Sequence, residues 1–287
     1  MRLRTLPVSL AGVIGALGYS RLLEKPDWVV FILCVLFAVL AQIASNFANE
    51  YFDFKDGLDK PGREGPRRGV TEGDIKPRAM KIAAFGTLGL ACCIGLSLIY
   101  WGGWIILVAG IIIAIGVLAY STGPFPLSHR CLGEVAVICF FGLAPVCLTF
   151  YLMTGYVDTY VWSGAIALGL MGANVLLVNN IRDIRDDREV HKYTVAVVFG
   201  RKTASFLYLF NGWLAVWLMG SVWLWIGNGW LIVPSLYLFG HTYLWYRIDI
   251  QSRIAAKDPA TAHMLNPYLG MTACLMAVYS LLFCIAA

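Results

Sequence analysis

The sequence is poor in charged residues. Only 14% of its 287 residues are Asp, Glu, Lys or Arg, whereas about a quarter are charged in ordinary soluble domains. Hydrophobic residues make up 59%. This composition excludes a disordered chain and disfavours a water-soluble globule. Six long stretches contain no charged residue, and they are 28–49, 82–129, 135–157, 159–181, 203–246 and 259–287.

The sequence also lacks the usual patterns of reactive or metal-binding cysteine and histidine. Its eight cysteines show no Cys-x-x-Cys or Cys/His spacing of the kind that predicts a zinc site or a disulfide framework. All but Cys131 lie in apolar stretches, where we expect small buried side chains. No Ser/His or Cys/His pair indicates an enzymatic nucleophile, so any chemistry must depend on other residues.

The uncharged stretches predict membrane-spanning helices. About 20 apolar residues cross a bilayer as a helix, and helix is the form that satisfies the backbone in lipid. Two stretches are too long for one crossing and break at glycine-containing aromatic sequences, 100–104 and 227–230. We therefore predict an all-α integral membrane protein that forms one domain, with nine transmembrane helices. The expected spans are 5–22, 28–48, 80–100, 104–120, 133–153, 159–179, 203–225, 230–246 and 264–285.

The basic residues indicate how these helices are oriented. With nine helices and a cytosolic N-terminus, every Lys and Arg except Arg21 and Lys25 lies on the cytosolic side. Cytosolic loops of membrane proteins carry an excess of Lys and Arg, which favours this orientation. The net charge of +5 then describes a cytosolic membrane face and gives no indication of nucleic-acid binding.

Most of the acidic residues lie in two loops of this face, 50–74 and 183–189. Each loop begins with an asparagine that an aspartate follows four residues later, as Asn49/Asp53 and Asn179/Asp183. Residues at this spacing share one helix face, so each helix should extend past the membrane core and present an amide and a carboxylate. Two such clusters repel each other unless cations bind, and their oxygen atoms suit Mg²⁺.

Basic residues are interleaved with these acids. Arginine offers forked donors to phosphate oxygens, so the mixture suits a metal-bridged phosphate or diphosphate. The plain alternative, a solvated charged loop, applies to the lysines and to Glu72 and Asp74, whereas the duplicated Asn-x-x-x-Asp pair favours a functional site. The basic residues of the two loops include Lys55, Lys60, Arg63, Arg67, Arg68, Arg182, Arg185, Arg188 and Lys192.

A third segment, residues 120–134, is nearly neutral and contains two prolines and several hydroxyl groups. This chemistry suits a lid over an organic ring better than a metal site. An ordinary tight connector remains an equal alternative from the residues alone.

Three groups of residues together resemble the UbiA-type intramembrane prenyltransferases over nearly the whole chain. The first group is Asn49, Glu50, Asp53, Gly57, Asp59, Arg63, Gly65, Pro66 and Arg68. The second is Asn179, Asn180, Arg182, Asp183, Asp187, Arg188, Lys192, Thr194 and Gly200. The third comprises the short sequences 4–7 and 132–134.

The later part of the first motif, residues 57–66, resembles the variant found in 1,4-dihydroxy-2-naphthoate polyprenyltransferases of menaquinone synthesis. Three positions depart from the family pattern. Glu50 stands where aspartate is common, and Cys131 and His191 stand where glycine is usual. Glu50 keeps the charge on a longer arm, and His191 places a bulkier group beside Lys192.

The resemblance implies an activity and its location. The activity is transfer of a polyprenyl group from its diphosphate to 1,4-dihydroxy-2-naphthoate, with loss of CO₂ and diphosphate, giving demethylmenaquinone. It would take place in a central cavity open to lipid, with the diphosphate at the cytosolic face of a bacterial inner membrane. The expected partners are a polyprenyl diphosphate, an aromatic acid and the lipid bilayer, with no nucleic acid and no obligate protein partner.

The resemblance also assigns roles to residues. Helical periodicity does not choose between Asp186 and Asp187, and the family pattern chooses Asp187. The expected ligands of two Mg²⁺ ions are Asn49, Asp53, Asn179, Asp183 and Asp187. The candidates for the diphosphate clamp are Arg67, Arg68, Arg182 and Lys192. The further substrate-binding candidates are Asn49, Asp59, Arg63, Tyr120, Ser121, Arg130 and Asn180.

Other functions remain open at this stage. Within the same family the acceptor could instead be 4-hydroxybenzoate or homogentisate. An ion-coupled transporter would place its acidic groups near the membrane midplane rather than at helix ends. A phosphatidyl-group transferase would carry an Asp-Gly-x-x-Ala-Arg motif, which this sequence lacks.

Overall fold

The computed structural model describes residues 6–57, 68–120 and 126–287, with the side chains of Trp223 and Leu224 left aside. These residues are almost all helical, and among them the one β-type contact is an isolated bridge between Arg130 and Tyr193. The long helices are α1 (Leu6–Leu23), α2 (Trp28–Lys55), α3 (Pro77–Ser97), α4 (Ile99–Ala119), α6 (Ala144–Thr154), α7 (Thr159–Arg182), α9 (Val195–Ile226), α10 (Tyr237–Lys257) and α11 (Asn266–Ala286). The short helical segments are η2 (Leu127–His129), α5 (Gly133–Val137), the π-helix η3 (Ile138–Leu143), α8 (Ile184–Glu189), η4 (Gly229–Leu236) and η5 (Pro259–Leu265).

Eight helical segments of the described chain are long and apolar enough to cross a membrane, which confirms the membrane-protein prediction in its coarse form. Both predicted breaks are present. Gly103 has φ 61° and interrupts the helical backbone inside α4, and Gly227 has φ 72° after α9. Glycine adopts these positive φ values without a steric penalty. The eight segments are Leu6–Leu23, Trp28–Lys55, Pro77–Ser97, Ile99–Ala119, Gly133–Thr154, Thr159–Arg182, Val195–Val222 and Pro259–Ala286.

The predicted span 230–246 is the segment that departs from expectation. It begins as the 3-10 helix η4 and continues as α10, which ends at Lys257 rather than near residue 246. The last part of α10 carries Arg247, Asp249 and Arg253, so this helix is not among the eight apolar segments. The absence of charge up to residue 246 indicated where the apolar part ends, but it did not indicate where the helix ends.

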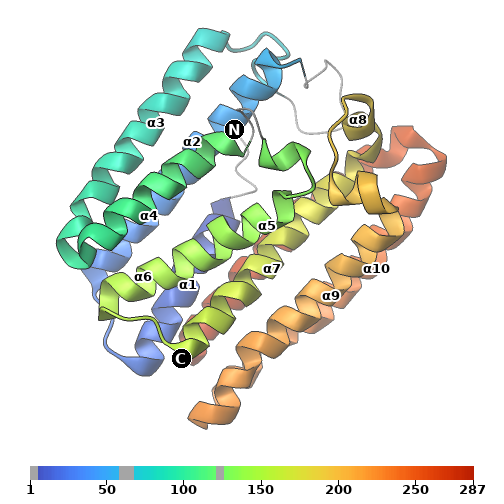
Figure 1. The fold of residues 1–287 in the computed structure, drawn as a ribbon. Helices are drawn as coiled ribbons and strands as arrows, with labels where there is room; N and C mark the ends of the chain where they lie inside the picture. The colour runs from blue at the N-terminus through green and yellow to red at the C-terminus, as the bar shows by residue number, and fades with distance from the viewer. Residues whose placement is uncertain (1–5, 58–67, 121–125) are drawn as a thin grey trace.

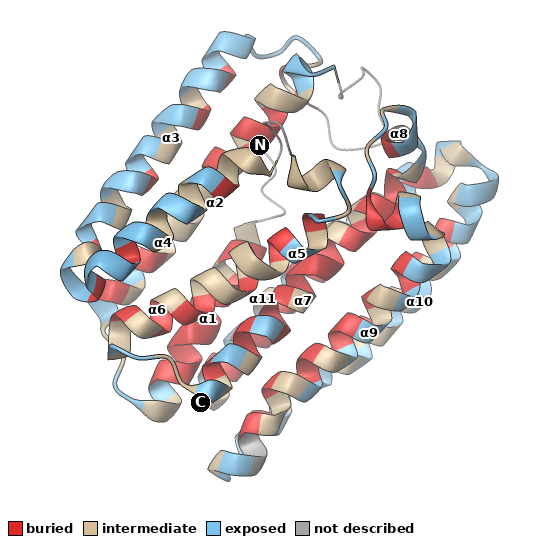
Figure 2. Cartoon of the chain, in the orientation of Figure 1, coloured by how far each residue is buried: buried red, intermediate tan, exposed pale blue. Residues whose placement is uncertain are grey.

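Helix α7 forms the centre of the bundle. It packs against α1, α6, α9 and α11, and 78% of its most apolar window is buried, against 17% for α3 and for α4. Figure 2 shows the same contrast, with buried residues concentrated on α7 and exposed ones along α3. The outer helices expose large apolar side chains such as Ile112 and Ile115. Lipid solvates such side chains, so the outer surface is apolar while the inner one is packed.

The two motif-bearing helices run in the same direction. Asp27 caps the start of α2 by accepting hydrogen bonds from the backbone N–H groups of Val29 and Val30, at 2.9 and 3.1 Å. Asp158 caps α7 in the same way, with the N–H of Tyr160 at 2.9 Å. A side-chain oxygen at this position satisfies N–H groups that have no partner within the helix. Both helices begin at the same end of the bundle, and their motifs lie at the opposite end, beside α8 (Figure 1).

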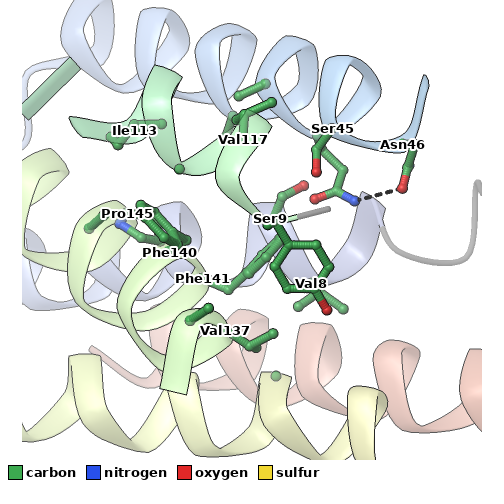
Figure 3. Close-up of a pocket in the computed structure, with 18 of the residues that line it drawn as sticks. Val8, Ser9, Ser45, Asn46, Ile113, Val117, Val137, Phe140, Phe141 and Pro145 are labelled. Carbon is green, nitrogen blue, oxygen red and sulfur yellow. Dashed lines mark hydrogen bonds between the residues drawn. The ribbon is translucent and has the colours of Figure 1, made fainter. Parts of the chain in front are cut away.

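The segment between η2 and α6 is not a regular helix. Its last part, directly before α6, is the π-helix η3, and the backbone at Gly142 lies directly against α7. A Cβ atom at Gly142 would lie 2.6 Å from the Cα atom of Gly169, so only glycine permits this approach. A π-helical turn widens the helix and re-aims its side chains. Here it directs Phe140 and Phe141 towards a cavity (Figure 3).

Candidate functional site

A cavity of about 280 Å³ lies between α1, α2, α4, the α5–η3–α6 segment and α7. Figure 3 shows Phe140 and Phe141 of η3 across this space from Ser45 and Asn46 of α2. Its deep part is lined by apolar residues, among them Val13, Cys34, Leu98, Ile106, Leu148 and Leu152. Its mouth, at the motif end of the bundle, is lined by Asn49, Asp53, Arg68, Asn179, Asn180 and Lys192. The cavity is thus apolar in its depth and polar at its mouth.

The first motif presents Asn49 and Asp53 from the last turns of α2. The Nη2 atom of Arg68 lies 3.1 Å from the Oδ2 atom of Asp53, and the Arg68 side chain is 3% exposed. The buried Glu50 points elsewhere, because its Oε1 atom accepts a hydrogen bond from the backbone N–H of Val70 at 3.2 Å. Glu50 therefore stabilises the turn that follows Arg68 and does not line the cavity.

The second motif is organised around Arg182. Its Nε and Nη2 atoms donate to the two carboxylate oxygens of Asp183, at 2.6 and 2.7 Å. Its Nη2 atom also donates to Asn179 Oδ1, and its Nη1 atom donates to Asn266 Oδ1, both at 2.8 Å. Arg182 and Asp183 are buried. This arrangement fixes Asn179 at the cavity mouth and joins α7 to the start of α11.

The chain bends between the two acids of this motif. The sequence argument treated residues 179–187 as one helix, but α7 ends at Arg182, and Asp183 has φ −91° and ψ 12° before α8 begins. The N–H of Asp187 still donates to the carbonyl oxygen of Asp183 at 2.8 Å, so the two residues remain one turn apart. Asp187 is buried, and its Oδ1 atom lies 3.1 Å from Lys192 Nζ. Asp186, by contrast, is only partly buried.

The third segment is attached to the second motif by backbone hydrogen bonds. The N–H of Cys131 donates to the carbonyl of Tyr193 at 2.6 Å, and the N–H of Tyr193 donates to the carbonyl of His129 at 3.0 Å. Burial and the nearby Lys192 ammonium lower the pKa of His129, because both disfavour its charged form. Within the described part of this segment, Ser128, Cys131 and Glu134 are among the residues that line the cavity, so the segment contributes to the cavity wall.

Two residues at this junction have an unusual backbone conformation. Among the described residues, Cys131 and His191 are the two non-glycine residues with positive φ, at 57° and 55°. Both stand where the family resemblance places glycine. The departures from the family pattern thus coincide with backbone positions that glycine adopts at lowest cost.

The predicted site residues fall into three groups. Those that line the cavity are Asn49, Asp53, Arg68, Tyr120, Asn179, Asn180 and Lys192. Those that lie behind or beside its lining are Arg130, Arg182, Asp183 and Asp187. Those that lie outside the described residues are Asp59, Arg63, Arg67 and Ser121.

The sequence analysis did not identify several polar residues that line the cavity. On α2, Gln42 and Asn46 precede Asn49 and Asp53 at helical spacing, and Gln42 Nε2 donates to Asn46 Oδ1 at 3.3 Å (Figure 3). These amide side chains at helical spacing in an apolar helix could have been recognised from the sequence, but the prediction of the site considered mainly charged residues. The other residues that were missed are Ser9, Ser45 and Thr149, whereas Ser128, Glu134 and Thr194 lie in segments that the sequence analysis named without assigning them a place in the site.

The donors at the mouth fit Mg²⁺ bound together with a diphosphate. Asn49, Asp53 and Asn179 offer hard oxygen atoms from two helices to one cavity. Across the described ranges, no three His, Cys, Asp or Glu side chains are grouped as a metal-binding cluster. Mg²⁺ usually takes one or two protein carboxylates and completes its octahedron with water and phosphate oxygens. The residues present therefore suit a metal that the substrate helps to hold.

The fold and the site define a class of protein, namely helical membrane proteins with a cavity that is apolar in its depth and polar at its mouth. The model of the UbiA prenyltransferase family matches residues 6–283. The chain belongs to this family, which confirms the resemblance drawn from the motifs.

Relatives with known names agree with this assignment. The 1,4-dihydroxy-2-naphthoate octaprenyltransferase of Mycobacterium tuberculosis is 37% identical over 216 residues, which cover 75% of this chain and 73% of the relative. The protein of the same name from Haemophilus influenzae is 35% identical over 214 residues, with 69% and 67% covered.

Two solved structures share the fold. A UbiA homolog from Aeropyrum pernix K1 in its apo form matches with a TM-score of 0.69 at 17% identity, over 97% of this chain and 98% of that one. A UbiA homolog from Archaeoglobus fulgidus, bound to DMAPP and Mg²⁺, matches with a TM-score of 0.57 at 16% identity, over 99% and 98%.

Proposed function

We propose that this protein transfers a polyprenyl group from polyprenyl diphosphate to 1,4-dihydroxy-2-naphthoate, with loss of CO₂ and diphosphate, giving demethylmenaquinone in its reduced, quinol form. The observation that carries the proposal is the cavity, which combines an apolar depth with a mouth built from both Asn-x-x-x-Asp motifs. A prenyl diphosphate has the same division between a long apolar tail and an anionic head. The names of the relatives support the naphthoate acceptor.

At the mouth, the diphosphate would bind to cationic side chains and to metal ions. Arg68 and Lys192 line the cavity and supply donors for its oxygen atoms. Two Mg²⁺ ions, when bound, would neutralise charge on the leaving group. The residues that would hold them are Asn49, Asp53, Asn179, Asp183 and Asp187, of which Asp183 and Asp187 pair with Arg182 and Lys192 in the structure.

The acceptor ring would bind between the mouth and the apolar depth. Tyr120 lines this part of the cavity and is our candidate to orient the ring. An electron-rich ring attacks an allylic cation without an enzymatic nucleophile, in keeping with the sequence. We place the mouth at the cytosolic face of a bacterial inner membrane, with α10 as the ninth span, because the basic residues lie almost entirely at that end.

The test is product analysis with a panel of acceptors. The purified protein in detergent is incubated with Mg²⁺, a polyprenyl diphosphate and one of 1,4-dihydroxy-2-naphthoate, 4-hydroxybenzoate or homogentisate. Mass spectrometry should detect a prenylated product with the naphthoate, EDTA should abolish its formation, and added Mg²⁺ should restore it. Product with another acid alone would reassign the acceptor, and full turnover after exhaustive chelation would contradict the metal-dependent mechanism.

A further inference from the structure

Glu134 places on the cavity wall a carboxyl group that the diphosphate chemistry does not use. It lines the cavity and is partly buried, and its Oε1 atom accepts a hydrogen bond from Asn180 Nδ2 at 2.8 Å. None of the ion pairs formed by the described residues involves Glu134. An ionised carboxylate has about four acceptor positions on its two oxygens, so the Asn180 amide and the backbone N–H of Glu134 itself leave positions for another partner.

The position of Glu134 relates it to the reaction centre. Asn179 and Asn180 are neighbours on α7, and successive residues of a helix point about 100° apart. Asn179 is held by Arg182 at the diphosphate end, while Asn180 is turned towards Glu134. Both asparagines line the same cavity. The carboxyl group of Glu134 thus lines the same cavity as the mouth residues proposed to hold the diphosphate.

The surroundings of Glu134 include a phenol. A Cβ atom at the preceding residue, Gly133, would lie 3.8 Å from the hydroxyl of Tyr120, which lines the cavity as well. Phe140, one turn and a half further along the same segment, supplies an aromatic wall. A carboxylate, a phenol and an aromatic face together form a site for a flat ring that carries hydroxyl groups.

We propose that Glu134 accepts a hydrogen bond from a ring hydroxyl of the aromatic acceptor, and that Asn180 holds the carboxyl group in place. This inference rests on the proposed function. Hydrogen bonds to an ionised acceptor are roughly twice as strong as neutral ones, so the contact favours acceptors with a free hydroxyl. The acceptor's own carboxylate is repelled by Glu134, so the ring is favoured in the orientation that places this carboxylate away from Glu134.

The experiment compares acceptors that differ in one hydroxyl. The value of kcat/KM is measured with 1,4-dihydroxy-2-naphthoate and with each of its two monomethyl ethers. The parent enzyme should prefer the free diol over one of the ethers by at least about 100-fold, because a site built for a hydroxyl rejects the analogue that lacks it. Glu134→Leu should reduce this preference to within about threefold. Glu134→Gln, which retains a neutral acceptor, should lower the preference for the free diol about tenfold.

Controls separate recognition from folding. Glu189→Gln removes an exposed carboxylate on α8 and should leave the preference unchanged. The KM for the prenyl diphosphate should stay near the parent value in both Glu134 variants, and size-exclusion chromatography checks that they fold. If Glu134→Leu does not fold, the ratio of kcat/KM for the free diol to kcat/KM for the ether is measured with Glu134→Gln instead, and a ratio equal to that of the parent would overturn the inference.

The outcomes are distinct. An unchanged preference for the diol in a folded Glu134 variant would show that the residue only joins α5 to α7, and would overturn the inference. A parent enzyme that prenylates no aromatic acid would instead overturn the proposed function. A parent enzyme that prenylates the naphthoate but does not distinguish the diol from either ether would overturn the inference alone.

Discussion

The guanidinium of Arg182 donates hydrogen bonds of 2.6 and 2.7 Å to the two carboxylate oxygens of the next residue, Asp183. Both side chains are almost inaccessible to solvent. The remaining Arg182 contacts reach Asn179 and Asn266, so all three guanidinium nitrogens have protein partners. The sequence argument placed Arg182 among the direct donors to diphosphate. The structure supports a positioning role, in which Arg182 sets the geometry of Asn179 and Asp183.

This relationship predicts the effect of removing the guanidinium. Arg182→Gln leaves Asp183 as a buried charge without its main partner, which typically costs about 3–5 kcal/mol of folding free energy. Thermal unfolding in detergent should therefore show a clearly lower midpoint for this variant. Arg188→Gln, at an exposed position of α8, is the control, with an expected change within about 0.5 kcal/mol. Equal midpoints for the two variants would contradict the positioning role.

The two neighbouring acids of α8 should behave differently. Asp187→Asn, like Asp183→Asn, should lower kcat at least about 100-fold, the scale on which lost electrostatic stabilisation of a transition state is measured. Asp186→Asn should cost less than about tenfold, because its side chain is partly exposed and lies outside the family pattern. Steady-state kinetics on the three variants provide the comparison. An inactive Asp186→Asn beside an active Asp187→Asn would show that the motif assignment is wrong by one residue.

The positive φ angles at Cys131 and His191 predict stabilising substitutions. A left-handed conformation costs a non-glycine residue about 1–2 kcal/mol, and part of this is offset by the greater freedom of glycine in the unfolded chain. His191→Gly should therefore raise stability by up to about 1 kcal/mol in thermal unfolding, and Cys131→Gly should act in the same direction. Cys131→Ala keeps the Cβ atom and should give no such gain. A destabilised His191→Gly would count against backbone strain at this position.

The lowered pKa of His129 predicts a pH dependence of stability. Because burial and Lys192 hold the folded-state pKa below the ordinary 6.5, with Asp53 and Asp56 opposing them more weakly, the unfolded chain takes up the proton first as the pH falls. Stability is therefore lost as the pH drops from above 6.5 through the folded-state pKa. His129→Gln should show a shallower loss of thermal stability between about pH 7.5 and pH 5. Parallel profiles for parent and variant would contradict this account.

Charge and glycine patterns predicted much of the fold. The breaks at Gly103 and Gly227 were visible because glycine and aromatic residues interrupt apolar runs. The extension of α2 through Asp53 was visible because the Asn-x-x-x-Asp spacing is helical. The length of α10 was not visible, because packing on neighbouring helices sustains a helix beyond its apolar part.

The site was predicted in its components but not in their pairing. The duplicated motif identified Asn49, Asp53 and Asn179, which the structure brings to one cavity. Periodicity could not show the bend at Asp183, since the bend depends on tertiary contacts of Arg182. The contact between Glu134 and Asn180 joins residues far apart in sequence, so no local sequence pattern could predict it.

The central claim is prenyl transfer to the naphthoate with loss of its carboxyl group. The most direct test supplies 1,4-dihydroxy-2-naphthoate labelled in the carboxyl carbon together with Mg²⁺ and a polyprenyl diphosphate, and quantifies CO₂, diphosphate and prenylated product in one reaction. Our account predicts equal amounts of labelled CO₂, diphosphate and a product without the label. Diphosphate release with no prenylated naphthalene product, or a prenylated product that retains the labelled carboxyl group, would contradict it.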